Sequence, residues 1–235
     1  MWNMRALRVT LLAIWVSFAL LPSQAGAQGA WKLQKDTEGI QLYTREVPGQ
    51  VLKAFRGVMQ IKAPLRQVAA MLADVPAMPE WFFLLQESQF IGGEHVENSH
   101  VYLAMKGIWP VSPRDAVVHI LVRQDPITLS IHVDVVNEEG IKPRRDGFVR
   151  IPTLQASWRL TPISPTHTEV EIMGSADPGG MIPTALANFL VTTLPEQTLK
   201  KMRTQIARPE YQDLNIVYSK NPKLRELAEK LQFLQ

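Results

Sequence analysis

Residues 177–207 read DPGGMIPTALANFLVTTLPEQTLKKMRTQIA, and this stretch decides the fold that we expect. The turn Asp177-Pro178-Gly179-Gly180 ends an extended region, and Pro183 then opens a helical pattern, as proline does at a first helical position. Apolar residues recur along this pattern at Leu186, Phe189, Leu190, Leu199, Met202 and Ile206. A helix over residues 183–207 would be about 37 Å long at a rise of about 1.5 Å per residue.

A proline lies inside this long helical pattern. Pro195 has no amide hydrogen and clashes with the preceding turn of a helix. Thr193 and Glu196 stand at the spacing of a capping box, in which each side chain bonds a free amide at a helix start. We therefore expect the helix to kink or to restart at Thr193.

The sequence before this helix alternates with a period of two. The pattern is clearest from Ile127 to Val135, where Ile, Leu and Val occupy every second position and polar residues lie between them. Such alternation is typical of an antiparallel strand with one face in water. We expect strands over residues 40–45, 51–61, 99–106, 116–123, 127–135, 148–160 and 168–175, about seven in all.

A shorter helix interrupts the strands. It begins near Pro64, has Leu65, Val68, Ala69 and Leu72 at helical spacing, and ends before Pro76. These elements predict an α+β helix-grip fold, in which a curved antiparallel sheet wraps around the long carboxy-terminal helix. If the sheet curves far enough, its inner apolar side chains line a cavity rather than fill a core.

The first 27 residues have the three parts of a secretory signal peptide. Arg5 and Arg8 supply positive charge, residues 9–21 form an apolar run too short to span a bilayer, and Ala25-Gly26-Ala27 supplies small residues. We expect cleavage after Ala27, with an uncleaved amino-terminal anchor as the alternative. The resulting organisation is a signal peptide (1–27), one globular domain (28–208) and a helical extension (209–235).

Composition excludes several classes of protein. The chain has no cysteine, so it holds no disulfide and no thiolate metal site, and an exported chain without cysteine fits the bacterial periplasm best. Removing Arg5 and Arg8 leaves 25 − 2 = 23 basic residues against 22 acidic ones. Because nucleic-acid binding needs clustered positive charge, this balance gives no reason to expect it. Known catalytic elbows, zinc-binding helices and phosphate loops are absent from the sequence, and we expect no cofactor, no metal and no enzyme activity.

Several segments in order resemble the START (steroidogenic acute regulatory protein-related lipid transfer) family, bacterial exported branch. The pieces are Asp36-Thr37-Glu38-Gly39-Ile40 with Tyr43, Ala63-Pro64-Leu65, Asp74, Pro79-Glu80-Trp81, Trp109-Pro110-Val111-Ser112-Pro113-Arg114-Asp115, Val149-Arg150, Trp158, Asp177-Pro178-Gly179-Gly180 and Ile182-Pro183. The resemblance covers about residues 31–208 and implies a helix-grip fold that encloses one lipid or other apolar molecule. It implies a carrier that touches membranes transiently, and we expect a monomer.

Arg114 is the most informative charged residue under this resemblance, which places it inside the cavity. A buried guanidinium has five donors and can bind a hydroxyl, phosphate or carboxylate of a ligand. The alternative is a structural ion pair with an acidic side chain across the sheet. The other candidates for contact with the ligand are apolar or aromatic: Trp81, Tyr102, Met105, Trp109, Trp158, Leu186, Phe189 and Leu190. Each of these could instead be core.

Three alternatives follow from the residues around this domain. The interruption at Pro195 allows residues 183–192 to open as a lid, or it is a static kink. After Pro209 we expect a helix that Asn221 caps and Pro222 opens, with Leu224, Leu227 and Leu231 on the face that packs against the domain or a partner. The carrier itself has two alternatives, a cavity enzyme resembling cyclases or aromatases and a filled-core interaction domain.

Overall fold

The structure is a computed structural model, and it describes residues 29–50 and 52–234. The predicted signal peptide lies outside the described residues. Within them, no helix combines the length and the apolar character that a membrane crossing requires.

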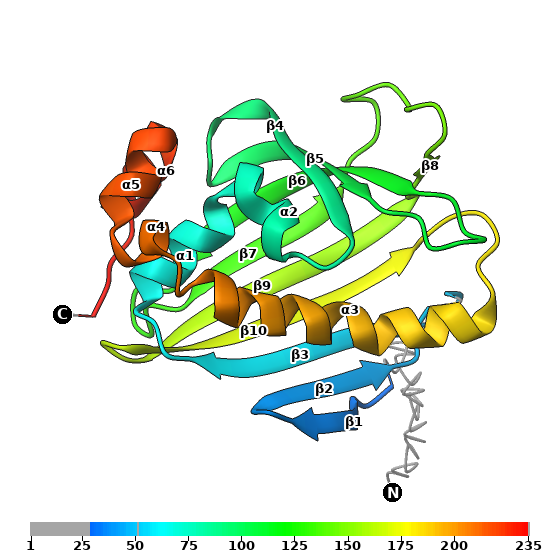
Figure 1. Ribbon diagram of the computed structural model, residues 1–235, viewed down its shortest axis with the longest axis horizontal. Coiled ribbons are helices and arrows are strands. Elements are labelled where there is room, and N and C mark those ends of the chain that lie inside the picture. Colours follow the sequence, from blue (N-terminus) through cyan, green and yellow to red (C-terminus); the bar gives the residue numbers. More distant parts are fainter. Residues whose placement is uncertain (1–28, 51, 235) are drawn as a thin grey trace, which may run out of the picture.

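One sheet dominates the molecule (Figure 1). Its strands are β1 (Lys32–Thr37), β2 (Ile40–Arg45), β3 (Ala54–Ile61), β4 (Leu85–His95), β5 (Asn98–Met105), β6 (Arg114–Gln124), β7 (Ile131–Asn137), β8 (Val149–Arg150), β9 (Thr153–Ser164) and β10 (His167–Asp177). The spatial order is β1-β2-β3-β10-β9-β7-β6-β5-β4, with antiparallel neighbours throughout. The short β8 lies off this path and pairs parallel with β6.

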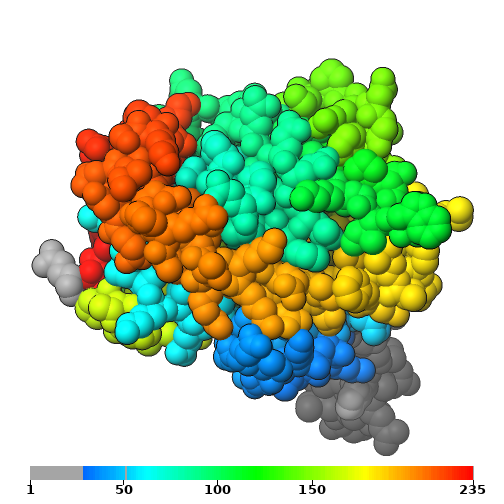
Figure 2. Space-filling model, viewed as in Figure 1, coloured from blue at the N-terminus to red at the C-terminus, as the bar shows by residue number. Residues whose placement is uncertain are grey.

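Helices cover one face of this sheet and one end of it. They are α1 (Leu65–Ala73), the short 3-10 helix η1 (Val75–Ala77), α2 (Met78–Trp81), α3 (Thr184–Gln205), α4 (Pro209–Gln212), α5 (Leu214–Lys220) and α6 (Pro222–Lys230). The long α3 packs against β2, β3 and α2, and the three last helices pack against α1 at one end of the molecule (Figure 1). In the space-filling view, α3 closes the surface between the β1–β2 hairpin and the segments from α1 to β5 (Figure 2).

Glycines set two features of this arrangement. A Cβ on Gly57 of β3 would lie 2.9 Å from Cδ1 of Leu199 on α3, so only glycine lets the helix approach the sheet this closely. Gly179 and Gly180 both have a φ of 64°, a conformation that glycine adopts without the steric strain of a side chain. They turn the chain from β10 into α3.

The α+β helix-grip prediction is confirmed, and several element predictions agree closely with the structure. The predicted strand at residues 40–45 is β2, and the predictions near β3, β5, β6 and β10 differ only at their ends. The predicted strand over 148–160 is divided at Ile151 and Pro152 into β8 and β9. The sheet of the described residues therefore has ten strands rather than about seven, because one predicted strand is two and because β1 and β4 were not predicted.

The two strands that the sequence missed lack regular alternation. All six residues of β1 are exposed, so the strand has no apolar face to reveal it. β4 pairs with β5 through three shifts of register, and these bulges break the period of two.

The predicted start of the strand over 127–135 is wrong. Ile127 is 90% exposed in a turn, and β7 begins only at Ile131. The cause is Asp125, whose carboxylate accepts hydrogen bonds from the amides of Ile127 and Thr128, each at 2.8 Å. An aspartate side chain that bonds nearby amides favours a turn over a strand.

The predicted restart at Thr193 is also wrong, because α3 continues through Pro195. Glu196 does not reach back to a helix start but binds Lys35 of β1 at 2.6 Å and Lys200 at 3.2 Å. The tertiary ion pairs thus replace the predicted capping box.

The carboxy-terminal extension packs on the domain. Asn221 is the residue before α6, as expected, although its side chain makes no capping hydrogen bond. Leu224 and Leu227 are buried, and Leu231 packs against the same core cluster.

Candidate functional site

A cavity of about 300 Å³ lies between the inner face of the sheet and the helices. Alternate residues of three central strands line it because side chains of a strand point to opposite faces in turn. From β6 these are Arg114, Ala116, Val118, Ile120 and Val122; from β7, Ile131, Val133 and Val135; from β9, Leu154, Ala156, Trp158 and Leu160. The first half of α3 adds Leu186, Leu190, Val191 and Leu194.

Arg114 is the buried charged residue in the lining of this mostly apolar cavity, whose two lysines, Lys53 and Lys106, are less buried. It is only 8% exposed, although it is charged. Its Nη1 donates to the carbonyl oxygen of Ser112, and its Nη2 donates to that of Gly179 at 3.2 Å. Its Nε is buried and has no hydrogen-bond partner among the described residues. Burial lowers the pKa of Arg114, because loss of water disfavours the charged form.

Asp115, the acidic neighbour of Arg114 in the sequence, pairs with a different arginine. Asp115 points to the opposite face of β6 and accepts two hydrogen bonds from Arg150, at 2.8 Å from Nε and 3.0 Å from Nη2. This pair is itself deeply buried. Within the described residues, no carboxylate forms an ion pair with Arg114, so the alternative of a structural ion pair for this residue is wrong.

Five of the nine predicted site residues line the cavity together. They are Met105, Arg114, Trp158, Leu186 and Leu190. Trp158 packs edge-to-face with Trp81 at a ring-centre distance of 6.1 Å, and Leu186 and Leu190 are four residues apart on one face of α3. Whether these side chains contact a ligand remains a prediction.

Two predicted cavity residues are buried elsewhere. Tyr102 faces away from the cavity because Val101, Leu103 and Met105 of the same strand face it. Trp81 is fully buried in the core behind Trp158 and does not line the cavity. For both, the predicted position in the cavity is wrong.

Two other predicted cavity residues are exposed. Trp109 is 92% exposed in the connection between β5 and β6, beside Ile108, which does line the cavity. Phe189 is 53% exposed, because the cavity side of α3 is the one that carries Leu186 and Leu190. Their predicted position in the cavity is wrong as well.

Sequence reasoning missed other lining residues. Phe55, Phe82 and Phe90 line the cavity, as do Leu227 of α6 and Leu231, which directly follows this helix. The predicted strand over residues 116–123 covers Ala116 to Val122, but Val117 and Leu121 make its other face apolar as well, so the sequence does not show which face lines the cavity. The apolar face of α6 was predicted, but not that it packs on the cavity. Nothing in the local sequence indicates that α6 reaches the cavity.

The lining offers little chemistry beyond its cationic side chains, which are Lys53, Lys106 and Arg114. Among the described residues that line the cavity, there is no carboxylate, imidazole or phenol group. No group of three or more His, Asp or Glu side chains in the described part of the chain is placed to hold a metal ion. General acid–base catalysis most often uses a His, Asp, Glu or Tyr side chain within hydrogen-bond reach of the substrate. The arrangement suits binding of an apolar molecule that carries one acceptor group.

Comparisons with known proteins agree with this geometry. The sequence model of the START domain matches residues 19–209. The uncharacterized protein PA1579 of Pseudomonas aeruginosa is 33% identical over 175 residues, which are 74% of this chain and 85% of that protein.

Solved structures are similar in fold. The STAR-related lipid transfer protein of Xanthomonas axonopodis is 35% identical, with a TM-score of 0.70 over 76% of this chain and 99% of that one. Human STARD10 is 17% identical and is therefore a likeness in fold alone, with a TM-score of 0.72 over 86% of this chain and 82% of that one. The match to most of its length and the identity to the bacterial relatives show that this chain belongs to the START domain family.

Proposed function

We propose that this protein binds one amphiphilic lipid in its cavity, with the acidic group of the lipid on Arg114, and carries it through the cell envelope without chemical change. Membership of a lipid-transfer family implies an apolar ligand, and the cavity supports the finer statement. The observation that carries it is a buried guanidinium, with an unpartnered Nε, in a mostly apolar lining.

The charge of Arg114 favours an acidic group over a hydroxyl. Its two hydrogen-bond acceptors are backbone carbonyls, which are neutral. A buried charge without an opposite charge lowers stability, and replacing it by an apolar residue is often neutral or stabilising. A carboxylate or phosphate of a ligand would supply the missing charge and accept two parallel hydrogen bonds. Arg114 is therefore better explained by binding than by folding.

The energetics of apolar chains in water favour transfer of the lipid by a carrier protein. Each exposed methylene is unfavourable by about 0.8 kcal/mol, so a dozen of them slow unassisted transfer by about 10 kcal/mol. A cavity that replaces membrane contacts with protein contacts lowers this barrier. Retention of the ligand without chemical change is supported by a described lining that holds no carboxylate, imidazole or phenol group.

The Arg114 end of the cavity has exposed apolar side chains that suit brief contact with a bilayer. Trp109 and Met181 are 92% and 96% exposed, and their chain neighbours Ile108 and Ile182 line the cavity. Trp109→Ser is expected to slow transfer to vesicles several-fold while leaving ligand affinity unchanged. Equal transfer rates in the two proteins would exclude this contact.

The first experiment is mass spectrometry of an organic extract of the protein, purified without detergent. We expect an acidic lipid at about one per protein, which Arg114→Leu loses while its unfolding free energy stays equal or rises. The matched control is Arg144→Gln, which removes an exposed arginine and should keep the lipid. A protein that carries no lipid and binds none from vesicles would refute the proposed function, and a neutral lipid would refute the role of Arg114.

We also propose that the protein is located in the periplasm, because residues 1–27 have the features of a signal peptide. Export predicts a mature chain that starts at Gln28 in the periplasmic fraction. Amino-terminal sequencing of the protein from fractionated cells tests this, and an intact Met1 in the cytoplasmic fraction would contradict it. The monomeric state is tested on the same sample by light scattering.

A further inference from the structure

The cavity extends along most of one strand. Every second residue of β6 from Arg114 to Val122 lines it, a separation of eight residues or about 26 Å of strand. Arg114 is the first residue of β6, so the cation lies at one extreme of this row. The other extreme, beside Val122, is the end of the cavity that receives α6.

Leu227 and Leu231 of the carboxy-terminal extension close this second end. Both line the cavity, together with Val122 and Ile120 of β6. The start of α3, near Arg114, and α6 lie at opposite ends of the molecule (Figure 1). The cavity thus has a charged end at Arg114 and an apolar end at α6.

Polar contacts hold α6 against the sheet at this place. Gln124, the last residue of β6, donates to the carbonyl oxygen of Gln232 and accepts from its amide, both at 2.8 Å. Lys230 forms an ion pair with Glu97, and Lys223 donates to the carbonyl oxygen of Glu94 at 3.4 Å. These contacts fix Leu227 and Leu231 in position at the end of the cavity.

This wall comes from outside the domain that the family shares. The match to the START domain ends at residue 209, whereas Leu227 and Leu231 follow it by about twenty residues. The extension is therefore not a passive tail, since it supplies part of the binding cavity.

We propose that Leu227 and Leu231 form the surface against which the apolar tail of the ligand ends, and that they set the length of the tail that fits. The inference rests on the proposed function, because it takes the head group of the ligand to lie on Arg114. A head held at one end and a wall at the other leave a fixed length between them, so a longer tail must bend or displace α6.

Affinities for a series of straight-chain fatty acids of increasing length test this directly. Their carboxylate suits Arg114, and each buried methylene raises affinity about fourfold until the tail meets the wall. Leu227→Ala and Leu231→Ala remove side-chain volume from the wall. We expect each to raise affinity about tenfold for a chain that is two methylenes longer than the one wild type binds best. Leu231→Phe should shift the preference to shorter chains.

The matched control is Leu224→Ala on the same helix. Leu224 is buried in the core beside Leu227 but does not line the cavity. Its loss should lower stability and leave the preferred chain length unchanged. If all three alanine variants share the preference of wild type, the wall proposal is wrong; Leu231, which is only half-buried, keeps the test available should Leu227→Ala not fold.

A second measurement separates this proposal from the proposed function. Xenon enters apolar cavities without needing a head group. Crystals of the full chain under xenon pressure should show a xenon atom against Leu227 and Leu231, and more xenon there in Leu227→Ala. If fatty acids fail to bind but xenon occupies this place, the acidic ligand is refuted and the wall stands. Absence of xenon beside α6 in wild type and variant overturns the wall.

Discussion

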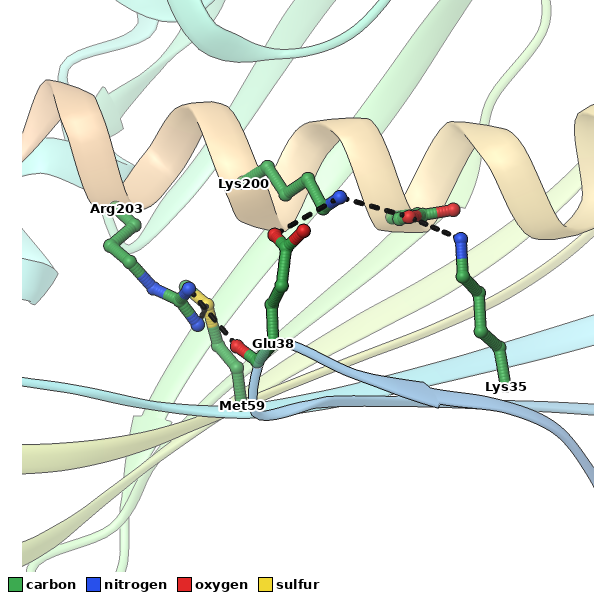
Figure 3. Close-up of polar contacts among 6 residues, drawn as sticks. Lys35, Glu38, Met59, Lys200 and Arg203 are labelled. Atoms are coloured by element: carbon green, nitrogen blue, oxygen red, sulfur yellow. Dashed lines mark hydrogen bonds and ion pairs between the residues drawn. The ribbon is translucent and has the colours of Figure 1, made fainter.

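The two halves of α3 differ in what holds them. After Pro195, the helix is fixed to the sheet: Leu199 and Met202 are fully buried, and Lys35, Glu38, Glu196 and Lys200 form a chain of ion pairs (Figure 3). Arg203 adds a hydrogen bond to the carbonyl oxygen of Glu38 at 3.1 Å. Before Pro195, the described side chains of α3 make no ion pair and no hydrogen bond to another element, and Leu186, Leu190 and Leu194 face the cavity.

This difference indicates that the two halves of α3 have different roles. The second half closes the fold, because its buried side chains and charges pack on β1, β2 and β3. The first half covers the cavity, because its apolar side chains face space rather than other side chains. Pro195 lies at the boundary and lacks the amide that would bond the preceding turn. We therefore propose that the first half is the part that moves for loading.

The largest expected effect is a difference in stability loss between two alanine variants, one in each half of α3. Leu199→Ala should lower the free energy of unfolding by about 3 kcal/mol, since it opens a void in close-packed core. Leu190→Ala should lower it by less than about 1 kcal/mol, because this side chain already borders the cavity and has fewer contacts to lose. Urea unfolding of both variants measures the contrast. Equal losses would show that the first half is packed as tightly as the second.

The boundary itself is tested by Pro195→Ala. The substitution restores an amide donor within α3 and should stabilise the protein by about 1 kcal/mol, less than the intrinsic difference between the residues because Pro195 is buried. Hydrogen exchange of residues 185–191 should slow relative to wild type, and ligand exchange with vesicles should slow with it. A lid that moves by another hinge would leave both rates unchanged, and the static kink would then be the better explanation.

The ion pairs of the second half make its attachment depend on pH. Hydrogen bonding to Lys35 lowers the pKa of Glu196 below its ordinary value of 4.5. A carboxyl whose pKa is lower in the folded state stabilises the fold above its unfolded pKa and loses this contribution as pH falls through the folded pKa. At neutral pH the free energy of unfolding of wild type should exceed that of Glu196→Gln by about 1 kcal/mol, and this difference should vanish well below pH 4.5.

Unfolding free energies of both proteins across this range give the measurement. The control is Glu226→Gln, an exposed carboxylate on α6, for which we expect no difference at any pH. A gap between wild type and Glu196→Gln that persists in acid would mean that shape, not charge, holds the second half.

The smallest effect concerns the outward side of the first half. Phe189→Ala should change stability by less than about 0.5 kcal/mol and leave ligand affinity unchanged, because the ring is mostly in solvent. Leu190→Ala, one residue further, should weaken ligand binding several-fold. Titration with the extracted lipid distinguishes them, and a loss of affinity in Phe189→Ala would mean that α3 turns when it closes.

Prediction from the sequence succeeded where the pattern is local and regular. β2 alternates between buried and partly buried residues, and the helix over 183–207 follows its apolar spacing. Prediction failed where a distant residue decides. The predicted capping box at Thr193 does not form, because Glu196 instead pairs with Lys35, which is 161 residues away in the sequence. The exposed strand β1 has no alternation that would predict it.

The sequence by itself determined the α+β class, the order of strands and long helix, and the family to which the chain belongs, because periodicity and turn residues act within a few neighbours. Only the tertiary structure decided that Asp115 pairs with Arg150, that Arg114 has no carboxylate partner among the described residues, and that α6 lines the cavity. The physical reason is separation along the chain. Arg114 meets the carbonyl of Gly179 across 65 residues and Gln124 meets Gln232 across 108, and no local pattern encodes which distant groups share one cavity.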